Sequence, residues 1–106
     1  MAVKFLISTL KPGVDPQDYE RWVRERDYVY TRSNPNFISY TVYRIEGEIQ
    51  GFPSAGWRYV ERIEVKDLEQ HARDLASEAG QKLIGELYGR FVDRARNIYL
   101  TTEEVK

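Results

Sequence analysis

A strand pattern near the N-terminus is apolar on both of its alternating sides, and this feature limits the fold more than any other. Residues 3–10 read VKFLISTL, so that apolar side chains occur at odd and at even positions. Because alternate side chains of a strand point to opposite faces of its sheet, such a strand has to be covered on both faces. A chain of 106 residues is predicted to form one domain, residues 1–106, so its own helices must provide part of this cover.

Further patterns predict two helical regions and three more strands. Asp15 can cap a helix that begins with Pro16, and the segment 33–36, SNPN, ends it. Asp67 caps a second helix, and a further helical stretch over about 78–88 is weakened by its glycines. The β-branched and aromatic segments that predict the other strands are 37–46, 57–65 and 91–102, with a loop over 47–56.

The order of these elements is β-α-β-β-α-β, which predicts an α+β fold of the ferredoxin-like class. Its four strands form one antiparallel sheet, and its two helical regions cover only one face of that sheet. The other face is apolar as well, and a second copy of the same sheet is the simplest cover for it. We therefore expect a two-fold homodimer in which the two sheets form a dimeric α+β barrel.

The composition excludes several kinds of site and partner. Lys and Arg number 16 and Asp and Glu 17, for a net charge of -1, which disfavours a nucleic-acid partner. The chain has no cysteine and one histidine, so one chain cannot form a thiolate or multi-histidine metal site. No segment resembles a signal peptide or a membrane span, and a cytoplasmic protein without a membrane partner is expected. No flavin or nicotinamide motif occurs, so neither a cofactor nor a metal is expected.

Two segments carry a resemblance to a known family. The aromatic first helix reads YERWVRERDYVYTR over 19–32, and the segment 78–95 reads EAGQKLIGELYGRFVDRA. With the β-α-β-β-α-β order, they make the whole chain similar to the RedY-like, or HapK-like, proteins of prodigiosin-type pigment biosynthesis, within the dimeric α+β barrel superfamily. The resemblance implies a homodimer that helps to make a pyrrole- or indole-derived secondary metabolite, with a small aromatic ligand and a partner biosynthetic enzyme. Proteins that share a fold can catalyse unrelated reactions, so the fold alone predicts none.

His71 and Glu61 are the predicted catalytic residues. His71 follows Leu68 by three residues and precedes Leu75 by four, which places the only histidine on the buried face of its helix. An imidazole there can transfer a proton near neutral pH, or it can be a structural group that a carbonyl or a tyrosine satisfies. Glu61 interrupts an apolar strand face, where a carboxylate has to be neutral or paired, with His71 or Arg26 as the expected partner. A salt bridge, or a place near the strand end that reaches water, would explain Glu61 without catalysis.

A set of aromatic and basic side chains is predicted to form the walls of a cavity between the sheet and the helices. Flat aromatic walls suit a planar heteroaromatic ligand, although such side chains fill cores at least as often. Arg26 can hold an anionic substrate group or stack on a ring, or it can extend its charged end into water. The predicted substrate-binding residues are Trp22, Arg26, Tyr43, Trp57 and Tyr59. The alternate strand faces, which we expect to meet the partner sheet, carry Tyr40, Arg44, Arg58 and Arg62.

These residues support one leading function and two alternatives. The leading hypothesis is a cofactor-independent enzyme that binds a planar aromatic intermediate and assists cyclisation, condensation or proton transfer. In it, His71 moves the proton, and Glu61 orients His71 or acts as base. The first alternative is a non-catalytic carrier that shields a reactive hydrophobic intermediate, and the second is a cofactor-free aromatic monooxygenase. One imidazole could also hold a haem, but nothing else in the sequence favours one.

Overall fold

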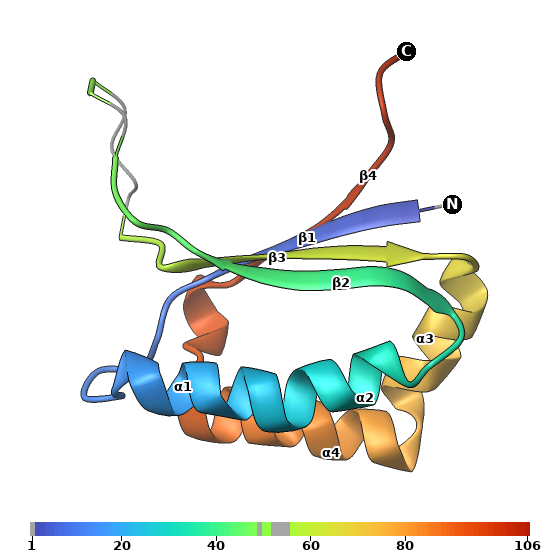
Figure 1. Ribbon diagram of the computed structural model, residues 1–106, viewed down its shortest axis with the longest axis horizontal. Helices are drawn as coiled ribbons and strands as arrows, with labels where there is room; N and C mark the ends of the chain where they lie inside the picture. The colour runs from blue at the N-terminus through green and yellow to red at the C-terminus, as the bar shows by residue number, and fades with distance from the viewer. Residues whose placement is uncertain (1, 49, 52–55) are drawn as a thin grey trace.

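Four strands form one antiparallel sheet in the computed structural model, which describes residues 2–48, 50–51 and 56–106 (Figure 1). The strands are β1 (Ala2–Ser8), β2 (Phe37–Arg44), β3 (Tyr59–Val65) and β4 (Ile98–Thr102). Their order across the sheet is β2-β3-β1-β4, and every neighbouring pair is antiparallel. This arrangement confirms the predicted α+β, ferredoxin-like fold.

The first helical region runs between β1 and β2 without a break. It consists of α1 (Pro16–Trp22), a π-helical turn η1 (Val23–Asp27) and α2 (Tyr28–Arg32). Asp15 caps it as predicted, because its side chain accepts a hydrogen bond from the backbone N–H of Gln17 at 2.9 Å. Asp27 in the π-helical turn is buried and bonded to Tyr40 of β2, so this turn faces the sheet.

The second helical region is divided into two helices. They are α3 (Leu68–Ala76) and α4 (Glu78–Glu86), and a π-helical turn η2 (Leu87–Phe91) extends α4. Asp67 caps α3 as predicted, and Ser77 caps α4. Gly80 is required where the two helices meet, since a Cβ atom there would lie 2.1 Å from the carbonyl oxygen of Asp74. The glycine therefore permits the close start of α4 against the end of α3.

The last strand is shorter than the pattern predicts. Phe91 and Val92 suggested a strand from 91 onward, but Phe91 ends η2 and both side chains are buried in the core. A short 3-10 helix, η3 (Arg94–Arg96), then precedes β4. The apolar run ends a helix rather than beginning a strand, and alternation over so few residues does not separate the two.

A β-bulge at Ile38 inverts the predicted faces of β2. Phe37 and Ser39 pair with neighbouring residues of β3, so Ile38 is an extra residue in β2. Beyond the bulge, Tyr40 lies on the helix-covered face and is buried, whereas Tyr43 lies on the opposite face and is 53% exposed. The prediction that Tyr43 faces the helices and Tyr40 faces a partner sheet is therefore wrong.

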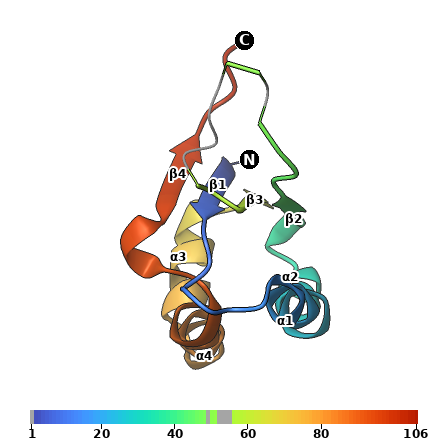
Figure 2. The same ribbon diagram turned by 90° about the vertical axis from the view of Figure 1, so that its left-hand side faces the viewer.

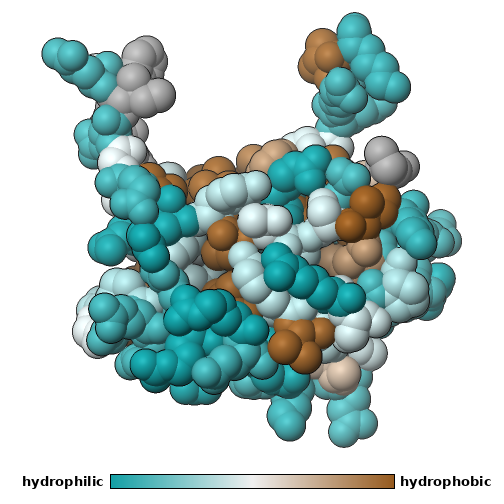
Figure 3. Space-filling model, in the orientation of Figure 1, coloured by the Kyte–Doolittle hydropathy of each residue, from teal (hydrophilic) through white to brown (hydrophobic). Residues whose placement is uncertain are grey.

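All helices lie on one side of the sheet, and the other side of the sheet is left open (Figures 1 and 2). Strand pairing places on this open face Val3, Phe5, Ile7, Tyr43, Val60, Ile98 and Leu100. Arg62 also lies there, as predicted, and bonds to Ser39 and Glu64. The space-filling view shows apolar residues along this edge of the molecule (Figure 3). A sheet face with this many apolar side chains is typical of a surface that another molecule covers.

Two further features of the described residues bear on the sequence predictions. No helix among them is long and apolar enough to cross a membrane. The predicted loop 47–56 is described only in part, because residues 49 and 52–55 lie outside the described residues.

Candidate functional site

A cavity of about 130 Å³ lies between the helices and the sheet. Its walls are mostly apolar, and polar side chains reach it from η1, β2, β3 and α3, namely Asp27, Tyr40, Glu61 and His71. The remaining lining residues are Leu6, Trp22, Tyr30, Thr31, Phe37, Ile63, Leu75, Leu83, Ile84, Leu87, Tyr88 and Tyr99. A mostly apolar pocket in which a few polar groups converge is the usual form of a small-molecule site.

A chain of hydrogen bonds joins three of these polar groups. The Tyr40 hydroxyl donates to Asp27 Oδ2 at 2.7 Å and lies 3.0 Å from Glu61 Oε2. The Tyr19 hydroxyl donates to the other oxygen of Glu61, Oε1, at 3.3 Å. All four side chains are buried, and Tyr40 is the most exposed of them at 7%. One phenolic hydroxyl therefore connects two buried carboxyl groups.

The contacts among Asp27, Tyr40 and Glu61 can all be hydrogen bonds only if one of the two carboxyl groups carries a proton. A phenolic hydroxyl has one hydrogen, so Tyr40 can donate to Asp27 or to Glu61 but not to both. None of the ion pairs formed by the described residues includes either carboxyl group. If both were ionised, one would be a buried charge facing the lone pair of Tyr40. A proton on either carboxyl group turns that contact into a hydrogen bond.

Burial raises the pKa of both carboxyl groups. For Glu61, loss of water is the largest cause and the negative charge of Asp27 adds to it, while the bonds from Tyr40 and Tyr19 oppose the rise. Burial is also the largest cause for Asp27, and the Tyr40 bond and the charge of Arg26 oppose it. The positive charge of Arg26 opposes the rise for Asp27, whereas no cation opposes it for Glu61. At neutral pH, the proton therefore resides mainly on Glu61, and Asp27 is the carboxylate.

His71 lines the cavity without a complete set of hydrogen bonds. Its side chain is buried, and Nε2 lies 3.4 Å from the Tyr99 hydroxyl, which is a long contact. Nδ1 has no hydrogen-bond partner among the described residues. Burial, followed by the positive charge of Lys4, lowers the pKa of His71, so the imidazole is neutral at pH 7. A buried ring nitrogen without a partner can be satisfied by a ligand or by water.

Three of the predicted site residues line this cavity, namely His71, Glu61 and Trp22. Glu61 does not form the expected pair with His71 or Arg26, because its two oxygens bond to Tyr19 and Tyr40. No group of three or more His, Asp or Glu side chains in the described part of the chain is arranged to hold a metal ion. The roles predicted for these residues in catalysis and substrate binding remain predictions.

Arg26 lies outside the cavity lining and is already paired. Its Nη2 lies 2.9 Å from Glu86 Oε2, and its Nε donates to the same carboxylate. Trp22 Nε1 donates to Glu86 Oε1 at 3.0 Å as well. The three side chains hold the first helical region against α4. Arg26 is therefore not a free cation for an anionic substrate group.

The other three predicted substrate-binding residues are also absent from the lining. Tyr43 lies on the open face of the sheet because of the bulge in β2. Trp57 precedes β3, and the guanidinium of Arg96 lies 5.0 Å from its ring centroid. Tyr59 is buried in the core, where its ring packs against Tyr19 at a centroid distance of 4.7 Å. Substrate contacts by these residues stay a prediction.

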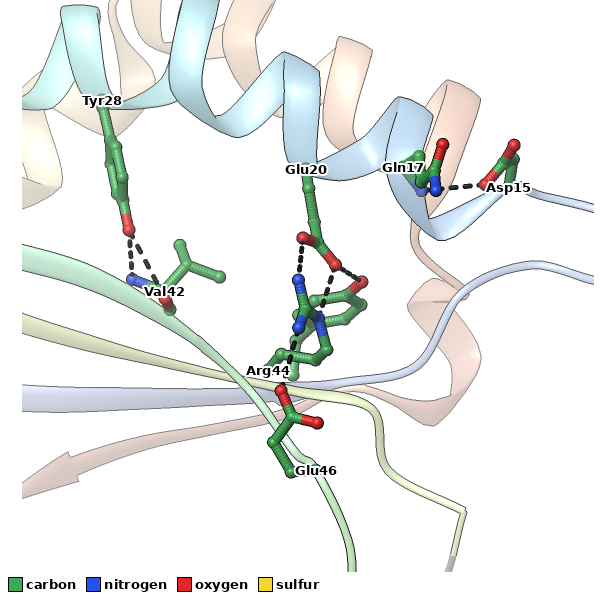
Figure 4. A network of polar contacts seen from close by, with 8 residues as sticks. Asp15, Gln17, Glu20, Tyr28, Val42, Arg44 and Glu46 are labelled. Carbon is green, nitrogen blue, oxygen red and sulfur yellow. Dashed lines mark hydrogen bonds and ion pairs between the residues drawn. The ribbon is translucent and has the colours of Figure 1, made fainter.

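A second polar cluster lies on the same elements, closer to the start of the first helical region (Figure 4). Arg44 was expected to face a partner sheet, but beyond the bulge it points to the helices and forms an ion pair with Glu20 of α1. Glu20 Oε2 also accepts a bond from the Tyr59 hydroxyl at 2.7 Å, and Arg44 reaches Glu46 at 2.9 Å. This cluster is partly exposed and contains a cation.

The sequence reasoning missed Asp27 and Tyr40, although both line the cavity. Asp27 follows Val23 by four residues on the apolar stripe of the first helical region, and this spacing was a signal that could have identified it. Tyr40 was assigned to the wrong face of β2. No local signal in the sequence indicates the bulge that moves it.

Comparisons with known proteins agree with the fold. The family described as "REDY-like protein HapK" matches residues 2–105. The crystal structure of HapK from Hahella chejuensis superposes with a TM-score of 0.75 at 20% identity, covering 99% of this chain and 93% of that chain. At3g17210 from Arabidopsis thaliana gives a TM-score of 0.79 at 13% identity, with 100% and 97% covered. A dimeric ferredoxin-like protein from Thermobifida fusca gives 0.71 at 8% identity, with 97% and 90% covered. A search of curated proteins gives no match.

Proposed function

Because the chain belongs to the family of REDY-like HapK proteins, we propose that it acts in the biosynthesis of a pyrrole- or indole-derived secondary metabolite of the prodigiosin type. In this proposal it is a cofactor-independent enzyme that moves a proton on an aromatic intermediate during cyclisation or condensation. The observation that carries the proposal is one tyrosine hydroxyl within hydrogen-bond distance of two buried carboxyl groups at the wall of an apolar cavity. Groups with perturbed pKa values in a cleft are typical of proton-transfer sites.

The hydrogen-bond chain can return to its starting state after each proton shift. The Asp27 carboxylate takes a proton from one atom of the intermediate, and the protonated Glu61 gives its proton to another atom. Asp27 then passes its proton to the Tyr40 oxygen while the Tyr40 hydroxyl gives its own to Glu61. The intermediate is isomerised, and no proton is gained or lost overall. Donor and acceptor within one water-poor cavity suit this exchange.

His71 has a separate part in the proposal. The neutral imidazole faces the cavity from α3 with one ring nitrogen unpaired, so it can bind or accept a proton from a polar group of the intermediate. Of the two predicted catalytic residues, His71 is the one that has a buried polar atom without a partner among the described residues.

The function is tested by mass analysis of the intermediate that accumulates in the pathway, incubated with the purified protein. The native chain should consume the intermediate, and His71→Ala should lower turnover by about 100-fold, the usual contribution of a general acid or base. Arg73→Ala is the matched control, because it truncates an exposed side chain of the same helix that lies outside the cavity lining. Parental turnover by a folded His71→Ala protein would end the catalytic role of His71.

The same assay separates the two alternative functions. Tight binding without product, and with no effect of His71→Ala on binding, would indicate a carrier of a reactive intermediate. Stoichiometric consumption of oxygen during turnover would indicate a cofactor-free monooxygenase. Either result would contradict the proposed proton transfer.

We also propose that the open face of the sheet meets a second copy of the chain. Apolar side chains cover this face, and the chain extends past it on both sides, after β2 and after β4 (Figure 1). A twin sheet would bury these side chains and form an α+β barrel. Sedimentation at micromolar concentration should give a dimer, and Phe5→Glu should give a monomer, because it puts a charge into the centre of the apolar face. A folded monomer of the native chain would contradict the barrel.

A further inference from the structure

Building on the proposed function, we infer that the cavity accepts one neutral, unsaturated five- or six-membered ring that carries an N–H or O–H donor, as pyrrole does. It should reject anionic rings, rings that only accept hydrogen bonds, and fused two-ring systems. The volume of the cavity, the charge of its wall and the polar atoms that the protein leaves unpaired each support one part of this selectivity.

The volume limits the ligand to one ring. The cavity measures about 130 Å³. An apolar cavity of about 150 Å³ is known to hold one benzene ring, so a single ring fills a space of this size. Indole has nearly twice as many ring atoms as pyrrole and would have to displace packed side chains. The rest of a larger intermediate therefore stays outside the cavity, with one ring inserted.

The charge of the wall disfavours anions. Asp27 and Glu61 share a negative charge there, and none of the described lining residues is Lys or Arg. Arg26, which the sequence suggested as an anion-binding group, is held by Glu86 outside the lining. A carboxylated ring would lose its water and meet a like charge, and Lys4, the cation that acts on His71, lies outside the lining against the ring of Tyr99.

The unpaired polar atoms select for a hydrogen-bond donor. Tyr40 donates to one oxygen of Asp27, Oδ2, so the second oxygen, Oδ1, can accept a hydrogen bond from a ligand. A carboxylate oxygen can only accept a hydrogen bond. The N–H of a pyrrole ring satisfies it, whereas the oxygen of furan, a ring of nearly the same size and shape, would oppose one acceptor with another. His71 Nδ1 offers a second contact that can donate or accept according to its tautomer.

The test is a titration of the native protein with four probes, namely pyrrole, furan, pyrrole-2-carboxylate and indole. His71 is the only histidine, so its imidazole resonances report from the cavity without ambiguity. Pyrrole at about 10 mM should shift them, since five ring atoms support an affinity in this range. Furan should bind about 3- to 10-fold more weakly, the worth of one net hydrogen bond. Pyrrole-2-carboxylate and indole should each bind at least about 10-fold more weakly than pyrrole, because of desolvated charge and overpacking.

The Asp27→Asn variant tests whether the Asp27 carboxylate causes the preference for pyrrole over furan. The amide can present a donor as well as an acceptor, so the preference for pyrrole over furan should fall to less than about twofold. Asp18→Asn is the control, because it removes an exposed carboxylate from the same helical region, and the native preference should remain.

Equal binding of pyrrole and furan, or no shift of His71 by pyrrole, would overturn the donor selectivity. Indole binding as tightly as pyrrole would overturn the limit to one ring, and equal binding of the carboxylate would overturn the charge selectivity. These results are distinct from a failure of the proposed function. Turnover that still depends on Glu61 in a protein without ring selectivity would refute only this inference.

Discussion

Two clusters of carboxylate and tyrosine side chains connect the same three elements, and they differ in charge and in access to water. The first cluster consists of Glu20, Arg44 and Tyr59, and the second of Asp27, Tyr40 and Glu61. Each takes one carboxylate from the first helical region and its other two members from β2 and β3. Glu20 and Asp27 are seven residues apart, which is about two turns of helix. Because both clusters lie on the same three elements, the differences between them come from their local environments.

The environment reverses the direction of the pKa shift. The hydrogen bond from Arg44 is the largest influence on Glu20 and lowers its pKa to about 2, although burial opposes this. Glu61 has no such cation, and burial raises its pKa far above the usual range. Both carboxylates accept a hydrogen bond from a tyrosine, so the tyrosine does not determine the outcome. One arginine and contact with water therefore separate a structural ion pair from a group that can hold a proton at neutral pH.

The largest expected difference between the clusters is in turnover. Glu61→Gln should lower turnover by about 100- to 10,000-fold, the range for loss of a general acid or base, because an amide cannot release the shared proton. Glu20→Gln makes the same chemical change in the other cluster and should leave turnover within about twofold, since its partner is an arginine outside the cavity lining. Consumption of the pathway intermediate measures both. Similar losses of turnover in the two variants would show that the difference between the clusters does not affect catalysis.

A smaller difference is expected in stability when each cluster loses its tyrosine hydroxyl. Tyr40→Phe should lower the free energy of unfolding by about 2–3 kcal/mol, because it leaves buried oxygens of Asp27 and Glu61 without a partner. Tyr59→Phe should lower it by about 1 kcal/mol, because Arg44 still holds Glu20 and water can reach the site. Urea unfolding at pH 7 measures both values. Equal losses would mean that burial does not distinguish the two hydroxyl groups.

Much of this fold could be predicted from the sequence because its signals are local. The helix caps Asp15 and Asp67 were found from residue type alone, and their side chains do accept the expected bonds. Glu61 was identified because a carboxylate among apolar strand residues has to be explained. Its burial is confirmed, at 2% exposure. His71 was placed on the buried face of α3 from helical spacing, and it is buried there.

The set of residues that line the cavity could not be predicted, because it depends on the register of the strands and not on residue types. In β2 both alternating faces carry aromatic or β-branched side chains, so the pattern does not reveal the extra residue at Ile38. The bulge exchanges Tyr43 for Tyr40 in the cavity and turns Arg44 toward Glu20. One undetected residue therefore determines which side chains of β2 reach the cavity and the helices.

The pH dependence of stability should carry opposite contributions from the two clusters. A carboxyl group with a raised pKa in the folded state binds its proton more tightly there than in the unfolded chain. Glu61 therefore stabilises the protein fully below its unfolded pKa of about 4.5, and this contribution is lost as pH rises toward and through neutrality. The free energy of unfolding should fall by at most about 1.4 kcal/mol per pH unit for this one proton.

Glu61→Gln should remove that fall. The amide resembles the protonated acid and keeps a donor for the Tyr40 oxygen, so the variant should gain stability relative to the native chain as pH rises from 5 to 8. Urea unfolding at intervals of one pH unit gives both curves. Parallel curves for the native and variant proteins would show that Glu61 is ionised in the folded state at neutral pH.

The smallest effect should come from Glu20→Gln, and its sign distinguishes the clusters most directly. The lowered pKa of Glu20 means that its contribution to stability is present above about pH 4.5 and is lost as pH falls toward 2. The variant should be less stable than the native chain at pH 7 by no more than about 1 kcal/mol, because partly exposed ion pairs are weak. As pH rises, Glu20→Gln should therefore lose stability relative to the native chain, whereas Glu61→Gln should gain stability relative to it between pH 5 and pH 8. If both variants gained, or both lost, stability relative to the native chain as pH rises, the pKa values of the two carboxyl groups would be shifted in the same direction. Arg44 would then not be the cause of the difference between the clusters.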